Sequence, residues 1–289
     1  MNQSNQPLVS VVIPCYNHEN FVQDSIQSVI DQTYQNIELI IIDDGSKDSS
    51  VEKIQEMIPA CQERFIRFEF RYRPNKGLSE TLNEALEWCQ GKYYSGLASD
   101  DQMFDNKTAL QVAYLEKNKD CVGCFGGYQL IDENNIVTAY SKKDEKSYSF
   151  NEIFLHKHDL PAPTQMLLLN KLKEIGGYRK GIIIEDWYMW LKLAKIGKLH
   201  YISEYLAKYR SHNDNMSKKI EIMHLGRNQV LDMYSNEKLY KIAKKEIFWI
   251  YIAELKNIFF SKFVLEFSLF SLRNPIFFFK KIFSKIFIR

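Results

Sequence analysis

Residues 38–46 read ELIIIDDGS, a run of apolar residues followed directly by two acids, a glycine and a serine. A short apolar run bounded in this way is typical of a strand buried on both faces, and Asp-Asp-Gly-Ser is typical of the turn after it. Other strand patterns occur at 8–13, 65–72 and 93–98, and helical patterns alternate with them at 21–30, 51–58 and 78–88. This alternation predicts an α/β fold with a mainly parallel sheet and right-handed crossovers.

Polar residues follow three of these strands at the point where each strand ends. The three clusters are Pro14 to Asn17, Asp43 to Ser46 and Ser99 to Asp101. Because parallel strands end at the same edge of their sheet, and ligands of such sheets bind beyond that edge, we expect the clusters to converge on one site.

Asp100 and Asp101 form the most strongly charged of these clusters. Adjacent carboxylates repel each other, so two acids at a strand end favour a bound cation, and oxygen ligands suit Mg²⁺ or Mn²⁺. The alternative is a solvated turn in which Asp101 caps a helix over residues 103–117. The residues alone leave both interpretations open.

The bulk composition excludes several classes of protein. The 289 residues are 45% hydrophobic and 26% charged, enough for a full core in one large or two smaller domains. A net charge of +2 gives no general attraction for nucleic acid. Residues 1–7 are polar, unlike a signal peptide, and no apolar run reaches the ~20 residues that span a bilayer, so a cytosolic protein is expected.

The cysteines show no disulfide framework. Their number is odd, which predicts reduced thiols, at Cys15, Cys61, Cys89, Cys121 and Cys124. Cys121 and Cys124 have the spacing of half a zinc site, but no second pair of ligands follows. Two buried apolar residues are therefore the favoured interpretation.

The second half of the chain is less regular. Gly176 and Gly177 interrupt a helical pattern, and a helix over 187–196 follows, with Glu185-Asp186 at its amino-terminal end. Acids at that position stabilise a helix through its dipole, and without other motifs this structural role would be favoured over catalysis. From about Lys218 the pattern is helical, so the chain is expected to end in a helical extension.

A series of short motifs in fixed order resembles the family 2 glycosyltransferases. Those of the first part are VSVVIPCYN at 9–17, DDGSKD at 43–48, NKGLS at 75–79 with Asn83, GKY at 91–93 and SDD at 99–101. The likeness continues through GGY at 176–178, ED at 185–186 and YRSH at 209–212. It covers residues 8–217, and the ordered set is far more specific than any single motif.

The resemblance implies a GT-A fold, in which a nucleotide-binding α/β half merges with an acceptor-binding half. It also implies inverting transfer from a nucleoside diphosphate sugar. By position, Pro14, Tyr16 and Asn17 are expected to line the pocket for the base and ribose. Asp44 is expected to accept a hydrogen bond from the base. Lys76 is a candidate phosphate contact, with an exposed surface lysine as the alternative.

The resemblance places a divalent metal, Mn²⁺ or Mg²⁺, at the first pair of acids. Asp100 is expected to contact the ribose or the metal, and Asp101 to ligate the metal that bridges the diphosphate. Many relatives have an acid where this chain has Ala98, whereas others keep only the terminal Asp pair. The chain therefore departs from part of the pattern at the metal site.

In the second half, Glu185 and Asp186 match the base motif of the family. Asp186 is the expected catalytic carboxylate, which removes the proton of the acceptor hydroxyl and typically accelerates such a step ~10²–10⁴-fold. Residues 209–212 resemble a flexible lid, in which Arg210 is expected to contact the diphosphate and His212 to ligate the metal or a phosphate oxygen. An arginine tied to nearby carboxylates and an exposed histidine are the alternatives.

Residues 273–289 contain three successive phenylalanines and five basic residues but no acid. On a helix, one face holds Phe279, Ile282, Phe283 and Ile286, and another holds Lys280, Lys281, Ser284 and Lys285. A basic amphipathic helix is typical of an anchor on an anionic membrane surface. The alternative is a terminal helix that packs on the core with its lysines in water.

Together these features predict a GT-A catalytic domain over 1–217, with a donor half at about 1–101 and an acceptor half at about 102–217, and a helical extension over 218–289. The expected activity is metal-dependent, hexosyl-type transfer from a UDP-sugar to a glycan or lipid-linked acceptor. Such transfer belongs to the synthesis of surface polysaccharide or lipid-linked oligosaccharide. The expected location is the cytoplasm, with peripheral contact at the cytosolic face of the plasma membrane.

Two alternatives stay open at this point. A catalytically silent nucleotide-sugar-binding or scaffold protein of the same fold is favoured by Ala98 and disfavoured by the intact Glu185-Asp186 pair. A nucleotidyltransferase is disfavoured because its glycine-rich basic phosphate loop is missing from the sequence.

Overall fold

The computed structural model describes residues 6–213, 215–256 and 260–286. The chain divides into two compact units, Met1–Asn215 and Met216–Arg289. The assignment of separate donor and acceptor halves within the first unit stays a prediction.

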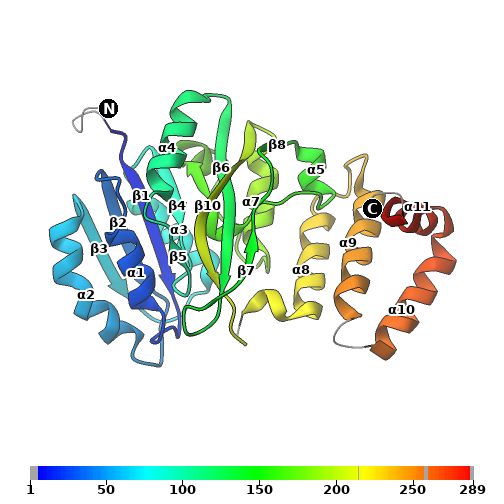
Figure 1. Ribbon diagram of the computed structural model, residues 1–289, viewed down its shortest axis with the longest axis horizontal. Helices are drawn as coiled ribbons and strands as arrows, with labels where there is room; N and C mark the ends of the chain where they lie inside the picture. The colour runs from blue at the N-terminus through cyan, green and yellow to red at the C-terminus, as the bar shows by residue number, and fades with distance from the viewer. Residues whose placement is uncertain (1–5, 214, 257–259, 287–289) are drawn as a thin grey trace. The chain divides into compact units, whose positions relative to one another are not determined.

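The amino-terminal unit is built on one sheet, which has ten strands among the described residues. The strand order is β3-β2-β1-β4-β9-β6-β10-β5, with β7 paired to β6 and β8 to β10 (Figure 1). The strands are β1 (Val9–Cys15), β2 (Ile37–Asp43), β3 (Arg67–Tyr72), β4 (Tyr93–Gly96), β5 (Gln102–Met103), β6 (Cys121–Ile131), β7 (Val137–Ser141), β8 (Lys146–Tyr148), β9 (Met166–Leu168) and β10 (Lys198–Arg210). The predicted parallel sheet is confirmed for β1 to β4, and antiparallel β9 joins it to the parallel pair β6 and β10.

Helices cover both faces of this sheet. The chain passes from β1 to β2 to β3 in one direction, so right-handed crossovers place α1 and α2 on one face, and the return to β4 places α3 on the other (Figure 1). The helices of the unit are α1 (Val22–Ile30), α2 (Ser50–Arg64), α3 (Leu78–Trp88), α4 (Lys107–Lys117), α5 (Phe150–Phe154), α6 (Leu169–Glu174) and α7 (Glu185–Leu193).

The hydrophobic core of this unit lies around β1 and β2. The pairing of these two strands places their ends side by side. Every residue of β2 is buried, and α1 buries Val22, Ile26 and Val29, which share one face of the helix. Burying one such side chain contributes about 1.5–3 kcal/mol. The register pairs Cys15 with Asp43, so the turns after the two strands lie next to each other. The five cysteines are buried free thiols, as the sequence predicted.

Several element boundaries differ from the prediction, and two of them affect the site. The helix expected over 103–117 begins at Lys107, because residues 102 and 103 form β5 and pair with β10. Asp101 therefore does not cap that helix. β10 continues to Arg210, which pairs with Ile131 of β6, so the first half of the predicted lid belongs to a strand.

The carboxyl-terminal unit is helical, as the pattern from Lys218 predicted. Its helices are α8 (Ile220–Asp232), α9 (Tyr240–Leu255), α10 (Phe260–Arg273) and α11 (Pro275–Ile286). Consecutive helices pack on each other, α8 on α9, α9 on α10 and α10 on α11. Ile220, Tyr251 and Leu255 form a small buried core.

Helix α11 contains most of the predicted membrane tail, and part of its surface is packed. Aromatic contacts join it to the preceding helices at Phe277 with Phe270, Phe278 with Phe267 and Phe278 with Trp249. Phe279 is 57% exposed. The rest of the predicted apolar face, together with Ser284 and Lys285, lies outside the residues whose side chains are described. None of the helices in the described ranges is both long enough and apolar enough to cross a membrane.

Candidate active site

One carboxylate and two imidazoles converge at the carboxyl edge of the parallel strands. Asp100 follows β4, His212 follows β10 and His18 follows β1, and one ligand atom of each lies within 4.8 Å of the others. Nε2 of His212 is 2.8 Å from Oδ2 of Asp100, and Nδ1 of His18 is 2.7 Å from Oγ of Ser99. Asn215 accepts from the backbone N–H of His212 at 2.6 Å and so holds this segment in place. We call His18, Asp100 and His212 the ligand cluster.

The two acids of the Asp100–Asp101 pair have different electrostatic environments. Burial alone raises the pKa of Asp100, but the hydrogen bond with His212 and the charge of His18 outweigh it, and the pKa lies below its ordinary value. Burial and the charge of Asp100 raise the pKa of Asp101 well above its ordinary value. The surroundings therefore favour the charged form of Asp100 and disfavour the charged form of Asp101.

Arg210 supports this turn from inside the protein and is 0% exposed. Its guanidinium donates to the backbone oxygens of Asp100 (2.8 Å), Asp132 (3.0 Å) and Glu133 (3.4 Å), to Oδ2 of Asp24 (3.1 Å) and to Oδ1 of Asn135 (2.8 Å). An arginine has five such N–H groups, so all of them have an acceptor. This arrangement fits the alternative, an arginine tied to neighbouring groups, better than the predicted contact with a diphosphate.

Asp101 is held by the same strand end. Its Oδ1 accepts a hydrogen bond from the backbone N–H of Arg210 at 2.9 Å, and the residue is 2% exposed. It is not a member of the ligand cluster. The geometry thus favours Asp100 over Asp101 as a metal ligand, and the role predicted for Asp101 stays untested.

Asp44 belongs to a contact between two loops. Its Oδ1 accepts from the N–H of Lys76 at 2.8 Å, its Oδ2 from the N–H of Gly77 at 2.9 Å, and Arg73 pairs with it. Gly45 has a φ of +79°, and a Cβ there would lie 2.6 Å from the backbone nitrogen of Asn75. Only glycine lets these two loops approach each other so closely.

The first and second polar clusters meet through Asn17. Its backbone N–H donates to Oγ of Ser46, and its Oδ1 accepts from the N–H of Lys47, both at 2.8 Å. Tyr16 is 45% exposed next to it, and Pro14 lies half-buried in β1. With the contact between His18 and Ser99, these bonds confirm that the three clusters converge.

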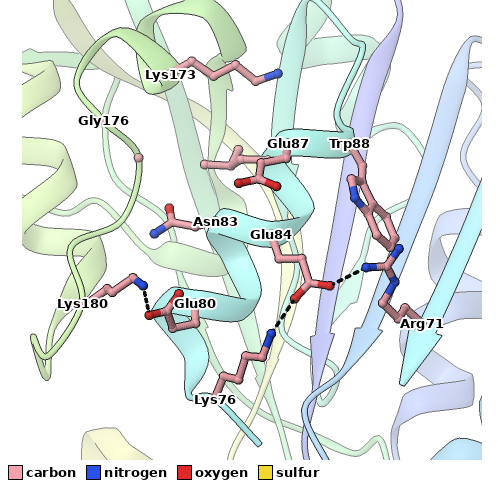
Figure 2. A pocket seen from close by; sticks show the side chains of 12 residues that line it. Arg71, Lys76, Glu80, Asn83, Glu84, Glu87, Trp88, Lys173, Gly176 and Lys180 are labelled. Atoms are coloured by element: carbon pink, nitrogen blue, oxygen red, sulfur yellow. Dashed lines mark hydrogen bonds and ion pairs between the residues drawn. The ribbon is translucent and has the colours of Figure 1, made fainter. Parts of the chain in front are cut away.

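A groove of about 780 Å³ lies beside α3, next to the loop that holds Asp44. Figure 2 shows the outer face of α3 on one side of it and the segment around Gly176 and Lys180 on the other. Nζ of Lys76 lies 3.9 Å from Glu84, which Arg71 approaches at 3.0 Å from the other side (Figure 2). In this structure Lys76 matches the alternative of a surface lysine, and its phosphate contact stays untested.

Glu185 and Asp186 lie half-buried in the first turn of α7, as predicted. The backbone N–H of Trp187 donates to Oδ1 of Asp186 at 2.6 Å. Burial raises the pKa of Asp186 to about 6, and burial with the charge of Asp186 raises the pKa of Glu185 to about 8. Negative charge on the pair is therefore favoured at Asp186 over Glu185.

Hydrogen bonds join the GGY motif to Asn83 of α3 and to β4. Asn83 donates to the backbone oxygen of Tyr178 at 2.7 Å and accepts from its N–H at 2.8 Å. Gly177 has a φ of +66°, and a Cβ there would meet Oδ1 of Asn83 at 2.6 Å. The hydroxyl of Tyr178 donates to that of Tyr94 in β4 at 3.2 Å.

His18 belongs to the ligand cluster but was not predicted from the sequence. The available signal was its place directly after Asn17, in the first polar cluster. Asp24, which holds Arg210, carried no signal in the sequence, since the two residues are 186 positions apart. Asn215, which holds His212, follows it by three residues and belongs to none of the motifs.

Residues 10–176 match the model of the family described as "Glycosyl transferase family 2". The chain belongs to this family. An uncharacterized glycosyltransferase of Rickettsia felis is 29% identical over 248 residues, which are 83% of this chain but only 40% of that protein. The Escherichia coli UDP-Glc:alpha-D-GlcNAc-diphosphoundecaprenol beta-1,3-glucosyltransferase WfgD is 30% identical over 215 residues, 73% of this chain and 79% of that protein.

Solved structures show the fold of this family 2 chain. S. aureus TarS in complex with UDP-GlcNAc superposes with a TM-score of 0.63 at 16% identity, over 87% of this chain and 73% of that one. The mannosyltransferase PcManGT of Pyrobaculum calidifontis, in complex with GDP-Man and Mn²⁺, superposes with a TM-score of 0.59 at 12% identity, over 94% and 83%. The predicted family and GT-A fold are therefore confirmed.

Proposed function

We propose that this family 2 glycosyltransferase moves a sugar from a nucleoside diphosphate sugar to an acceptor hydroxyl, with inversion at the anomeric carbon. The observation that supports this most is the convergence of His18, Asp100 and His212 at the sheet edge where ligands of such folds bind. A metal site at that edge suits a diphosphate leaving group.

The ligand cluster fits a divalent metal. Its donors are two imidazoles and a carboxylate that the surroundings keep charged, a set suited to a cation such as Mn²⁺. His18, Asp100 and His212 would hold the ion, which would neutralise charge on the departing diphosphate when bound. PcManGT, a protein of the same fold, was crystallised with Mn²⁺, which supports this assignment.

Asp186 is the proposed general base. The acceptor hydroxyl gives its proton to the Asp186 carboxylate while its oxygen forms a bond to the anomeric carbon. The bond from that carbon to the diphosphate oxygen breaks, and its electron pair leaves with the nucleoside diphosphate. A base placed in this way typically contributes ~10²–10⁴-fold in rate. Burial and the neighbouring Asp186 raise the pKa of Glu185 above that of Asp186, which favours negative charge on Asp186.

We further propose a UDP-sugar as the donor of a hexosyl group and a glycan or lipid-linked molecule as the acceptor. The names of two similar proteins support this: WfgD, which uses UDP-Glc and a diphosphoundecaprenol acceptor, and TarS, which was crystallised with UDP-GlcNAc. A role in surface polysaccharide or lipid-linked oligosaccharide synthesis follows, at the cytosolic face of an anionic membrane. The chain spans only 40% of the Rickettsia felis relative. The donor, acceptor and role proposed here are therefore proposals for this chain and not for that longer protein.

The test is an assay of nucleoside diphosphate release from a panel of UDP- and GDP-sugars with Mn²⁺ and candidate acceptors. Asp186→Asn keeps the size of the side chain but removes the base, so we expect transfer to fall at least ~10²-fold. Donor binding, measured by calorimetry, should stay within a few-fold. Asp144→Asn, at an exposed acid distant in sequence from every motif, is the matched control. Transfer by Asp186→Asn at the wild-type rate would show that another group is the base.

A silent nucleotide-sugar-binding protein of the same fold is the second candidate, because Ala98 stands where many relatives have an acid. It predicts donor binding without release of nucleoside diphosphate for any sugar and acceptor of the panel. Release that depends on Asp186 would exclude it.

A further inference from the structure

The carboxyl-terminal unit contains a groove between α9 and α10 with a volume of about 480 Å³. Its basic side chains are Lys241, Lys244, Lys245 and Arg273, and Glu266 is its acid. Lys244 is already engaged by Asp232 and Asn228. The other three cations form no ion pair with any residue that the structure describes, so the groove presents uncompensated positive charge.

Part of the lining of the groove is apolar, and so is the adjoining exposed face of α10. Phe248, Leu269 and Phe270 line the groove together with the cations. Leu265, Leu269 and Leu272 are spaced by four and three residues, so they share one face of α10. Leu265 is 58% and Leu272 79% exposed. We call these three leucines the α10 row.

The charge of the chain is divided unequally between its two units. The carboxyl-terminal unit has 14 Lys and Arg against 6 Asp and Glu, a net charge of +8. The amino-terminal unit has 24 against 30, a net charge of −6. The overall value of +2 therefore hides a strongly basic helical unit.

We propose that this groove binds the phosphate headgroup of an anionic phospholipid, with the α10 row in the outer acyl layer of the bilayer. Lys241, Lys245 and Arg273 would pair with the phosphate, and the leucines beside them would enter the apolar layer directly below it. Basic side chains at the border of an exposed apolar helix face are the arrangement of interfacial helices. An acidic peptide or a nucleic acid would use the cations but would leave the α10 row in water.

This site differs from the one predicted for residues 273–289, because its apolar face lies on α10. It rests on the membrane contact in the proposed function and specifies which residues would make that contact. Its test does not depend on sugar transfer, since binding to vesicles is measured without donor or acceptor. A failed proposal about catalysis and a failed proposal about this groove are therefore distinguishable.

The experiment is sedimentation of the full chain with vesicles of equimolar phosphatidylglycerol and phosphatidylcholine, compared with phosphatidylcholine alone. The combined variant Lys241→Gln, Lys245→Gln and Arg273→Gln should bind the anionic vesicles roughly a hundredfold more weakly. The control, Lys218→Gln, Lys219→Gln and Lys256→Gln, removes the same charge from exposed positions of the same unit outside the groove. It should lose less than about tenfold. Equal losses in the two variants would overturn the proposal in favour of general attraction.

Two further variants test the groove from other directions. Glu266→Gln removes its acid and should strengthen vesicle binding several-fold. Leu265→Ser with Leu272→Ser should weaken binding, whereas Ile222→Ser with Leu225→Ser, two exposed apolar positions on α8, should not. Circular dichroism should be unchanged in all of them, and so should nucleoside diphosphate release measured without vesicles.

Inorganic phosphate distinguishes a lipid from a free ligand. Under the proposal it competes with vesicles only weakly, because it lacks the acyl chains that the α10 row contacts. Binding of inorganic phosphate that is as tight as vesicle binding and is lost in the groove variant would overturn the lipid assignment. Binding of RNA or of an acidic peptide that is unaffected by the two leucine substitutions would do the same.

Discussion

Asp186 shows how one carboxylate is adjusted by its position in a helix. It lies in the first turn of α7, where the N–H of Trp187 stabilises its charge and burial disfavours that charge. Burial is the larger effect, so the pKa rises to about 6. A base with this pKa is ionised at neutral pH and still accepts a proton far more readily than an exposed aspartate.

We therefore predict that kcat/KM for transfer falls as the pH is lowered through about 6. The charged form of Asp186 is the active one, so activity is full above its pKa and is lost tenfold per pH unit below it. Initial rates between pH 5 and pH 8 with saturating Mn²⁺ measure this profile. Donor affinity at each pH is the control, since weaker donor binding would lower kcat/KM as well. A rate that does not change between pH 5 and pH 7 would contradict the assignment.

Asp100 and Asp101 are adjacent and have the same side chain, but their surroundings shift the two pKa values in opposite directions. The ligand cluster keeps Asp100 charged, whereas Asp101 is enclosed and bonded to the backbone of Arg210. The surroundings thus favour negative charge on Asp100 more than on Asp101.

At the scale of an element, the end of β10 supports the candidate active site. Pairing with β6 carries this strand as far as Arg210, whose side chain then joins the Asp100 turn to α1 and to the β6–β7 turn. His212 follows two residues later, so the strand end also positions one member of the ligand cluster. A strand, held by its ladder, fixes these groups more firmly than a free lid would.

Replacing Arg210 with methionine should lower the free energy of unfolding by about 1–3 kcal/mol, because the variant removes the donor to the backbone oxygen of the buried Asp100 and the ion pair with the half-exposed Asp24. Chemical denaturation of the two proteins gives this difference. Lys208→Met, on the same strand but without an ion pair among the described residues, should change it by less than about 0.5 kcal/mol. Similar small effects of both substitutions would mean that Arg210 is dispensable to this turn.

At the scale of the whole molecule, the chain consists of two units with separate cores and opposite net charge. The sheet unit contains the ligand cluster and the Glu185-Asp186 pair, and the helical unit contains the basic groove. A ligand that binds only one folded unit stabilises that unit by mass action.

We predict that UDP with Mn²⁺ slows hydrogen exchange in peptides of β1, β2 and β4 but not in peptides of α9 and α10. At about 100 times the dissociation constant, the stabilisation should be ~2.7 kcal/mol. Mass spectrometry of peptic peptides measures both units in one experiment. Asp100→Asn should remove the part of the protection that depends on Mn²⁺. Equal protection of all four elements would contradict the location of the site.

Local residue patterns were enough to predict the parallel strands β1 to β4, the helices between them and the three polar clusters at their ends. These features follow from local patterns, since hydrophobic period and turn residues act over a few positions. The ordered motifs also identified the family, and with it Glu185 and Asp186 at the start of α7.

The tertiary structure decided how the site residues divide their roles. His18, Asp100 and His212 are separated along the chain, and only the packed sheet brings their ligand atoms within 4.8 Å of one another. The charge state of Asp100, the enclosure of Asp101 and the buried position of Arg210 depend on neighbours from distant elements. Burial and charge–charge interactions act through space, so no local pattern of residues encodes them.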